Sequence, residues 1–296
     1  MKKISAILLA VCAAGMLSAY ETYAEAYKAG TTARTKRDYK SAYAAYEEAL
    51  KLSKSPSAKN SAEFMMGVVL CEDKQYDKGI AQLREALNSA VNPHQKVSAQ
   101  FHIAYYLGAQ KKYEEAIAEM QKVKEIGKGL KNTYVDLADC RIGTYLVALK
   151  RYDEALAAVK DSLANKNSNV AYAALLASYD ANKGLKNTEG MQAAVDGLLA
   201  LKEPQPYMFF TARVRAFELA RSQKKHEEAL KYGEEIASKE GLNAYMHDHG
   251  VYYKAVSYAS LGDKENAIAQ WKLLENSSVK YFKKNAASNI KRLEKK

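Results

Sequence analysis

Residues 111–117 read KKYEEAI, and variants of this stretch recur along the chain, such as RDYKSAY at residues 37–43 and KRYDEAL at residues 150–156. The small residue in each variant returns every 35 to 39 positions. These small residues are Ala42, Gly79, Ala116, Ala155, Gly190, Ala229 and Ala267. A period of about 20–50 residues is typical of stacked structural units that pack only on their neighbours. The sequence therefore predicts a repeat array and not a single globular core.

Each repeat contains two apolar-periodic segments of helical length joined by a short polar turn. In the third repeat, residues 97–110 and 114–126 carry apolar residues three and four positions apart, which places them on one helical face. The short turn between them forces the two helices to run antiparallel. A second small residue precedes most of the repeated ones by twelve positions, as Gly67 precedes Gly79, and predicts a close approach of the helices. We predict an all-α fold, a solenoid of about seven antiparallel helix–turn–helix repeats plus a C-terminal capping helix.

These features resemble the tetratricopeptide repeat family. The resemblance rests on the repeated small residue, on the small residue twelve positions before it, and on an aromatic three positions before it. The turn aromatics are Tyr39, Tyr76, Tyr113 and Tyr152. It covers about residues 21–276, with a period longer than the family's usual ~34 residues. Asn187, His226 and Lys264 stand where the other repeats have the turn aromatic. The resemblance implies a scaffold for protein or peptide partners.

Residues 1–19 have the pattern of a secretory signal peptide. Lys2 and Lys3 precede an apolar run at residues 4–17, and the small residues Ser18 and Ala19 follow it. The run is shorter than the ~20 residues that a membrane-spanning helix needs. We expect export to a periplasm or cell envelope, with cleavage after residue 19 or as late as residue 24. The repeat array then spans residues 20–277, and a basic C-terminal helix spans residues 278–296.

Cys12 leaves a second interpretation of this segment open. The text Leu9-Ala10-Val11-Cys12 resembles a lipoprotein attachment motif, except that Val11 stands where a smaller residue is expected. We favour a cysteine inside a discarded signal peptide. In the alternative, the protein is a lipoprotein-like structural or assembly component, associated with the membrane or wall, that binds anionic surfaces through its basic face.

The C-terminal segment, residues 278–296, has an apolar stripe and a basic face. The stripe consists of Val279, Phe282, Ala286, Ile290 and Leu293. The basic face consists of Lys280, Lys283, Lys284, Lys291, Arg292, Lys295 and Lys296. A repeat array needs a terminal helix with a polar outer face to cover its exposed core, so we predict a capping helix. The alternative is a basic helix that touches anionic lipid or an acidic partner.

No catalytic or cofactor motif is found in the sequence. It has no nucleophile elbow, phosphate-binding loop or dinucleotide fingerprint. His247 and His249 point to different faces of a helix, so they make a poor metal site. Cys71 and Cys140 belong to repeats separated by a third one, so we expect two buried thiols and no disulfide. We predict no enzymatic activity, no catalytic residues, no cofactor and no bound metal.

The formal net charge of +11 comes mostly from lysines. Sequence-specific nucleic-acid readers rely largely on arginine, and an exported protein rarely meets nucleic acid. We therefore expect no nucleic-acid partner. The excess charge is attributed to solvation and to peripheral contact with anionic envelope surfaces.

The candidate binding surface is the one implied by the family resemblance, the concave face lined by the first helix of each repeat. Projecting the family's positions onto this chain selects an apolar, tyrosine-rich groove suited to a peptide or helix. The candidate residues are Tyr27, Phe64, Phe101, Tyr105, Tyr172, Tyr179 and Tyr252. Ligand contact and packing between adjacent first helices remain equal alternatives for these side chains. The partner's identity and the oligomeric state do not follow from the sequence.

Overall fold

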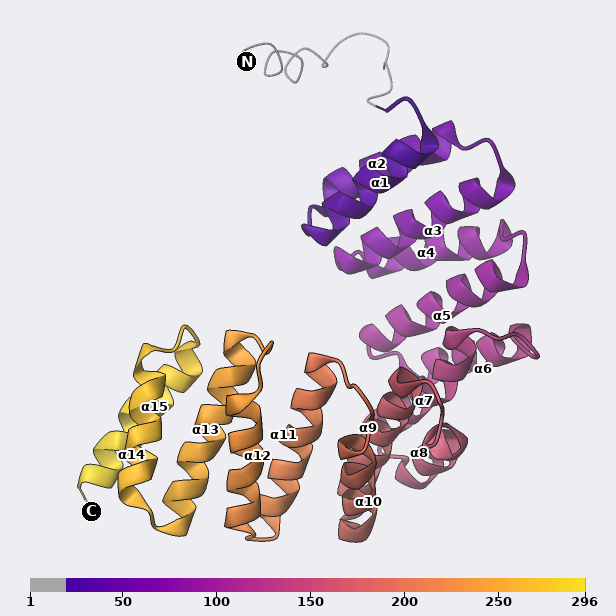
Figure 1. The fold of residues 1–296 in the computed structure, drawn as a ribbon. Helices are drawn as coiled ribbons and strands as arrows, with labels where there is room; N and C mark the ends of the chain where they lie inside the picture. The colour runs from indigo at the N-terminus through magenta and orange to yellow at the C-terminus, as the bar shows by residue number, and fades with distance from the viewer. Residues whose placement is uncertain (1–19, 296) are drawn as a thin grey trace, which may run out of the picture. The chain divides into compact units, whose positions relative to one another are not determined.

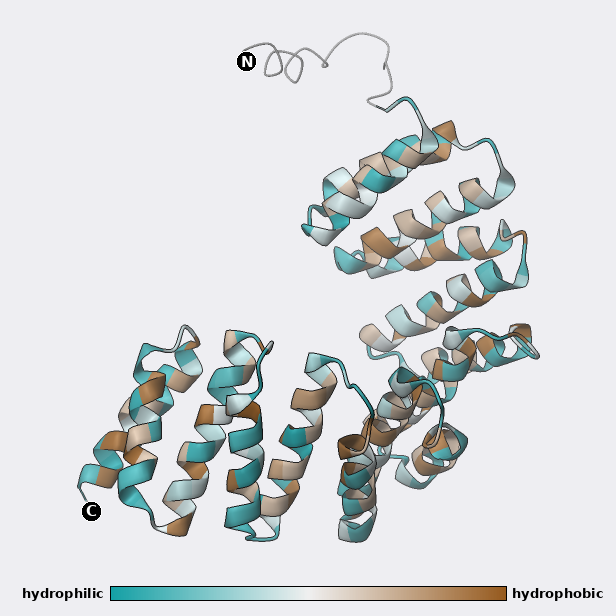
Figure 2. Cartoon of the chain, in the orientation of Figure 1, coloured by the Kyte–Doolittle hydropathy of each residue, from teal (hydrophilic) through white to brown (hydrophobic). Residues whose placement is uncertain are grey.

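The computed structural model describes residues 20–295, so the predicted signal peptide and Cys12 lie outside the described residues. The described chain consists of helices and turns, arranged as successive antiparallel hairpins (Figure 1). This confirms the predicted all-α fold class. Hydrophobic residues recur along every helix, while most of the turns are hydrophilic (Figure 2).

Within residues 20–295, seven first helices alternate with seven second helices, and one helix follows them. The first helices are α1 (Tyr23–Thr35), α3 (Pro56–Glu72), α5 (Pro93–Ala109), α7 (Thr133–Ala148), α9 (Ser168–Leu185), α11 (Pro206–Ser222) and α13 (Ala244–Leu261). The second helices are α2 (Tyr39–Leu52), α4 (Tyr76–Asn88), α6 (Tyr113–Ile126), α8 (Tyr152–Val159), α10 (Thr188–Leu199), α12 (His226–Ser238) and α14 (Lys264–Leu273). The 3-10 turns η1 (Lys160–Ser162) and η2 (Leu274–Asn276) extend α8 and α14, and the last helix is α15 (Lys280–Glu294).

The helix starts follow ordinary capping chemistry. Proline occupies the first turn of α3, α5 and α11, where its missing N–H costs nothing. Asn92 and Asn243 cap α5 and α13 by accepting a backbone N–H three residues on. Thr22 and Glu25 form a reciprocal capping box at the start of α1. These local signals fix where the hairpins begin.

The turn inside each hairpin contains one residue in the left-handed backbone region. In the third hairpin, Lys111 has φ 63° and the N–H of Lys112 donates to the carbonyl of Leu107 at 3.0 Å, which closes the end of α5. The residues in this conformation are Arg37, Lys74, Lys111, Lys150, Lys186, Lys224 and Gly262. Only the seventh is a glycine, the residue that adopts this conformation without steric cost.

The repeated small residues lie where the two helices of a hairpin approach most closely. A Cβ added to Gly79 would lie 2.8 Å from the backbone N of Cys71 and 2.8 Å from the carbonyl O of Gly67. A Cβ on Gly67 would in turn lie 2.8 Å from Leu83 Cγ. The small pair predicted from the sequence therefore sets the spacing between α3 and α4.

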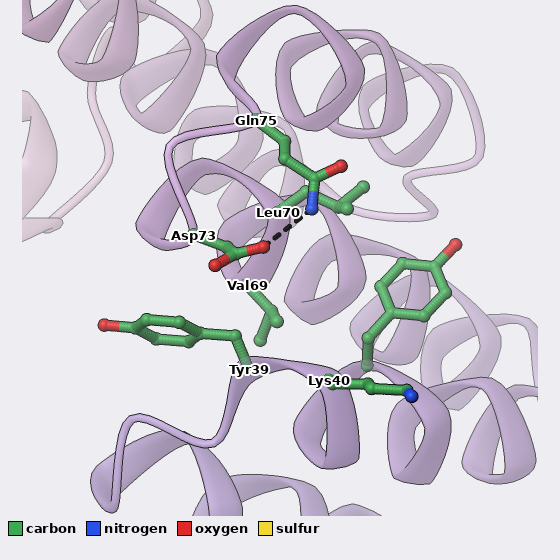
Figure 3. Close-up of a pocket in the computed structure, with 7 residues that line it drawn as sticks. Tyr39, Lys40, Val69, Leu70, Asp73 and Gln75 are labelled. Carbon is green, nitrogen blue, oxygen red and sulfur yellow. Dashed lines mark hydrogen bonds between the residues drawn. The ribbon is translucent and has the colours of Figure 1, made fainter.

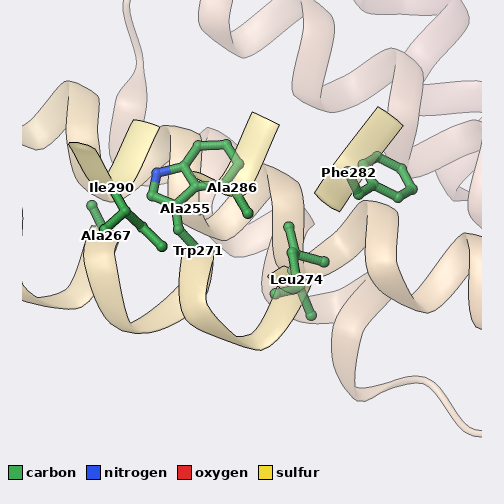
Figure 4. Packing of buried hydrophobic residues seen from close by; sticks show 8 residues of the cluster. Ala255, Ala267, Trp271, Leu274, Phe282, Ala286 and Ile290 are labelled. Atoms are coloured by element: carbon green, nitrogen blue, oxygen red, sulfur yellow. The ribbon is translucent and has the colours of Figure 1, made fainter. Parts of the chain in front are cut away.

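The chain divides into two compact units within α7. Unit 1 ends at Arg141, and unit 2 begins at Ile142. In unit 2, α15 packs its apolar stripe against α13 and α14: the buried Ala286 and Ile290 lie beside Trp271, and the buried Phe282 lies further along the helix (Figure 4). The described residues contain no helix long and apolar enough to cross a bilayer.

Neither of the two cysteines within the described residues forms a disulfide. Cys71 and Cys140 are both buried, as expected for small apolar side chains. Burial raises the pKa of the Cys71 thiol to about 12, so the group is a poor nucleophile.

Candidate binding faces on the first helices

The first-helix face of unit 1 is largely closed by its own aromatic side chains. Phe101 is only 5% exposed, and its ring stacks on Tyr134 with centroids 4.7 Å apart. Phe64 is half-buried and meets His102 edge-on at 4.9 Å. Tyr27 is half-buried and packs edge-on against Tyr46 at 5.2 Å. Phe64 and Phe101 therefore fill space between adjacent first helices, whereas Tyr27 packs on α2 of its own hairpin.

His102 lies at the centre of this closed cluster. Its ring contacts Phe64, Phe101, Tyr106 and Tyr134. Burial lowers its pKa, which favours the neutral ring. The Nδ1 atom lies 2.8 Å from the carbonyl oxygen of Ser98, so the neutral tautomer carries its proton on Nδ1 and donates it there. The histidine is therefore a satisfied member of the core.

An ion pair crosses the same face of unit 1. Arg34 on α1 donates to both carboxylate oxygens of Glu72 on α3, at 2.8 and 2.7 Å. The hydrogen bonds to Glu72 raise the pKa of Arg34. A bidentate pair between neighbouring first helices fixes their register more than it offers a free charge to a ligand.

Tyr105 is the most exposed tyrosine or phenylalanine in the described part of unit 1, at 39%. The guanidinium of Arg141 lies over its ring, 5.1 Å from the centroid. Of the four candidates in this unit, Tyr105 therefore offers the most surface to a partner.

The first-helix face of unit 2 carries a row of partly exposed tyrosines. One lies near the start of each successive first helix and one on α15; the tyrosine row is Tyr172, Tyr207, Tyr245 and Tyr281. Tyr207, Tyr245 and Tyr281 are 46%, 49% and 58% exposed. The rings of Tyr172 and Tyr207 meet edge-on with centroids 5.6 Å apart. This row is an open aromatic surface, unlike the face of unit 1.

A second histidine, His249, packs against Tyr245 of the tyrosine row. His249 lies 4.9 to 6.2 Å, centroid to centroid, from five rings, those of Phe210, Tyr245, Tyr252, Tyr253 and Phe282. Its Nδ1 is buried and has no hydrogen-bond partner among residues 20–295, and burial lowers the pKa of His249. The neutral imidazole therefore acts as one more aromatic ring that fixes Tyr245 in place.

Tyr252 and Tyr179 occupy different environments in unit 2. Tyr252 is half-buried between Trp271 at 5.4 Å and Tyr281 at 6.0 Å, and burial raises its pKa to about 12. Tyr179 is 1% exposed, and its hydroxyl donates to the backbone carbonyl of Arg215 at 3.4 Å. Tyr252 borders the tyrosine row, whereas Tyr179 belongs to the core.

Four charged groups form a network over Tyr179. Arg215 pairs with Asp180 and with Glu218, each at 3.2 Å, and Lys183 also reaches Glu218 at 3.4 Å. Burial raises the pKa of Asp180 despite the nearby arginine. The network links α9 to α11 much as Arg34 and Glu72 link α1 to α3.

Sequence reasoning missed three members of the tyrosine row, namely Tyr207, Tyr245 and Tyr281. The signal was present, because Tyr172 and these three follow one another at 35, 38 and 36 positions. The structure brings the candidates Phe64 and Phe101 together around His102 and leaves Tyr27 and Tyr105 in separate contacts.

A cavity of about 340 Å³ lies elsewhere in unit 1 (Figure 3). It is lined by the start of α2, the end of α3 and the turn after α3: Tyr39, Lys40, Tyr43, Val69, Leu70, Asp73 and Gln75. The side-chain amide of Gln75 donates to Asp73 at 2.6 Å across its edge. None of the candidate residues lines it. Among residues 20–295, no group of three or more His, Cys, Asp or Glu side chains is placed to hold a metal ion.

The hairpin geometry and the repeated small residues define a class of protein. Residues 26–56 match the family model of the tetratricopeptide repeat. The chain contains a tetratricopeptide repeat and has the fold of tetratricopeptide-repeat proteins, which confirms the resemblance drawn from the sequence. This fold is generally a non-enzymatic scaffold for protein partners.

Solved structures show the same fold at low sequence identity. A tetratricopeptide repeat protein from Parabacteroides merdae is 14% identical, with a TM-score of 0.55 over 92% of this chain and 98% of that one. PilW, a type IV pilus biogenesis factor, is 16% identical, with a TM-score of 0.56 over 78% and 99% of the two chains. PilF from Pseudomonas aeruginosa is 15% identical, with a TM-score of 0.53 over 77% and 95%. No curated protein matches the chain in sequence.

Proposed function

We propose that this protein is an exported, non-enzymatic scaffold that binds a segment of a protein partner along the tyrosine row of unit 2. The observation that carries the proposal is that a partly exposed tyrosine recurs on the successive first helices of unit 2 and on α15. The type IV pilus biogenesis factor PilW, which shares the fold, supports a scaffold role. At 16% identity it carries no partner over to this chain.

The tyrosine row has the physical properties of a protein-binding surface. Tyrosine offers a large, rigid ring and a polar hydroxyl at a low cost in side-chain entropy. The rings are pre-ordered, because Tyr207 leans on Tyr172 and Tyr245 leans on His249 and Phe282. Partly exposed aromatic side chains held by a packed base are typical of the few residues that dominate binding energy.

A triple variant tests the row directly. Tyr207→Ser, Tyr245→Ser and Tyr281→Ser together should abolish crosslinking of the purified chain to its partner in native envelope extract. A matched control replaces exposed apolar residues at helix ends in the same unit: Leu185→Ser, Leu261→Ser and Leu273→Ser, at 39%, 42% and 63% exposure. Equal crosslinking of one partner by both variants would contradict the proposal.

Export is a separate part of the proposal and has its own test. The predicted signal peptide at residues 1–19 supports it. Mass spectrometry of the protein from its natural source should find a mature chain that begins at Tyr20, or at Glu25 with later cleavage. A diacylated Cys12 would instead favour the lipoprotein-like component, and an intact Met1 would contradict export.

A further inference from the structure

The basic charge of unit 2 is concentrated in its last helix. Residues 142–279 contain 17 basic and 17 acidic side chains, so they are balanced. Residues 280–296 contain seven basic side chains and one acidic side chain, that of Glu294. The imbalance therefore belongs to α15 and the residues that follow it.

One face of α15 packs against the rest of unit 2. The opposite face of the helix is therefore exposed. Phe282, Ala286 and Ile290 are buried against α13 and α14 (Figure 4). The opposite side presents exposed residues three and four positions apart: Lys280, Lys284, Ser288, Lys291 and Lys295. Arg292 is exposed beside them. Because α15 has 15 residues, this cationic face extends about 22 Å along the helix.

The charges on the cationic face are not neutralised within the described part of the protein. None of the described basic side chains of α15 forms an ion pair, and Arg292 donates only to the amide oxygen of Asn289, at 2.9 Å. Elsewhere in unit 2, Arg213 and Arg215 pair with carboxylates. The cationic face is thus available to an anionic surface outside the chain.

We propose that the outer face of α15 docks on a bilayer of anionic phospholipid. The charges spread along the whole helix, which suits an extended anionic plane better than one carboxylate or a short acidic peptide. Of the seven basic residues in residues 280–296, all but Arg292 are lysines. A lysine acts as a point charge toward many headgroups, whereas an arginine favours fixed bidentate partners. Clusters of four to eight basic residues on an amphipathic helix are typical of contact with anionic lipid.

The exposed ring of Tyr281 adds to this fit. It is 58% exposed and adjoins Lys280 and Lys284 on the outer side of α15. Tyrosine is favoured at the level of lipid headgroups, where one end of the side chain is apolar and the other is hydrated. The docking does not depend on the tyrosine row binding a protein, so the two proposals can fail separately.

The test uses vesicles and a charge-matched control. Flotation of the chain from Tyr20 onward should show binding to vesicles of 30% phosphatidylglycerol in phosphatidylcholine and none to phosphatidylcholine alone. The face variant is Lys284→Gln, Lys291→Gln, Arg292→Gln and Lys295→Gln. The control variant removes the same charge elsewhere in unit 2, with Lys160→Gln, Lys166→Gln, Lys202→Gln and Lys231→Gln, all at exposed positions. Both leave Tyr281 intact, and circular dichroism verifies that both are folded.

The size of the effect decides the outcome. Each basic residue near an anionic surface contributes roughly fivefold in affinity, so the face variant should bind at least about 100-fold more weakly. The control variant should lose far less affinity for the same vesicles. Equal losses in the two variants would show a response to net charge alone and would overturn the proposal. Binding to poly-L-glutamate without binding to vesicles would overturn it in favour of an acidic protein partner.

Discussion

The two units use the same helical hairpin but treat their aromatic side chains in opposite ways. In unit 1, Phe101 is buried against His102 and Tyr134, and Tyr105 is the most exposed tyrosine or phenylalanine among the described residues. In unit 2, Tyr207, Tyr245 and Tyr281 are about half exposed on α11, α13 and α15. The difference lies in position along the helix. Phe101 is in the middle of α5, whereas each of the three tyrosines is the second residue of its helix.

The largest contrast is expected from truncating one ring in each unit. Phe101→Ala should lower the free energy of unfolding of unit 1 by about 3–5 kcal/mol, because it leaves a cavity among packed rings. Tyr245→Ala should lower the free energy of unfolding of unit 2 by no more than about 1 kcal/mol, since about half of the Tyr245 side chain is already in water. Hydrogen exchange followed by mass spectrometry reports each unit separately.

For partner binding, the two variants should rank in the opposite order to their effects on stability. Tyr245→Ala should weaken binding, while folded Phe101→Ala should retain it. If Phe101→Ala is stable but fails to bind, unit 1 carries the binding surface and the comparison between the units is wrong.

The second contrast concerns the small residues at the helix contacts. Gly79→Ala in unit 1 should cost about 2–3 kcal/mol, because the new Cβ would meet backbone atoms of Cys71 and Gly67 that cannot move alone. Gly190→Ala in unit 2 should cost less, since the atoms nearest its new Cβ belong not to the backbone but to the side-chain amide of Asn182, which can move at the cost of its hydrogen bonds with Ser178 and Asn187. Urea titrations of the two variants measure both values. A larger loss for Gly190→Ala would show that the buried amide of Asn182 is the more rigid neighbour.

The sequence was most informative where a physical constraint acts within one hairpin. The Gly67–Gly79 contact and the proline starts of α3 and α5 were predictable because close approach and capping leave few alternatives. The binding face was less predictable. The family positions reach the middle of each first helix, but α9, α11 and α13 are 17 or 18 residues long. Their first turns, which carry Tyr207 and Tyr245, lie beyond those positions. Burial of Phe101 by Tyr134 depends on contacts between repeats, which the spacing within one repeat does not encode.

A smaller contrast concerns the response of the two histidine clusters to acid. The pKa of His102 is lowered in the folded protein because the ring is buried, so the unfolded chain takes up a proton first. Its contribution to the free energy of unfolding is complete above its unfolded pKa near 6.5 and declines as the pH falls toward the folded pKa. Burial lowers the pKa of His249 as well, but this ring borders the open tyrosine row through Tyr245.

We therefore expect unit 1 to lose more stability than unit 2 between pH 7.5 and pH 5.5. Melting curves and hydrogen exchange at the two pH values measure the loss. His102→Phe keeps a ring among the aromatic neighbours and should remove most of the loss in unit 1. An unchanged pH response in His102→Phe would assign the effect to other groups.

The smallest effects are expected where the two units do not differ. Lysine at a left-handed turn position is less favourable than glycine, so Lys111→Gly in unit 1 and Lys224→Gly in unit 2 should each stabilise by about 0.5–1 kcal/mol. Gly262→Lys should destabilise by a similar amount, because Gly262 has φ 83°. Thermal denaturation of the three variants measures the sign. Unequal gains from the two lysine variants would mean that one lysine makes a contact of its own. The two units would then differ in their turns as well as in the exposure of their aromatic side chains.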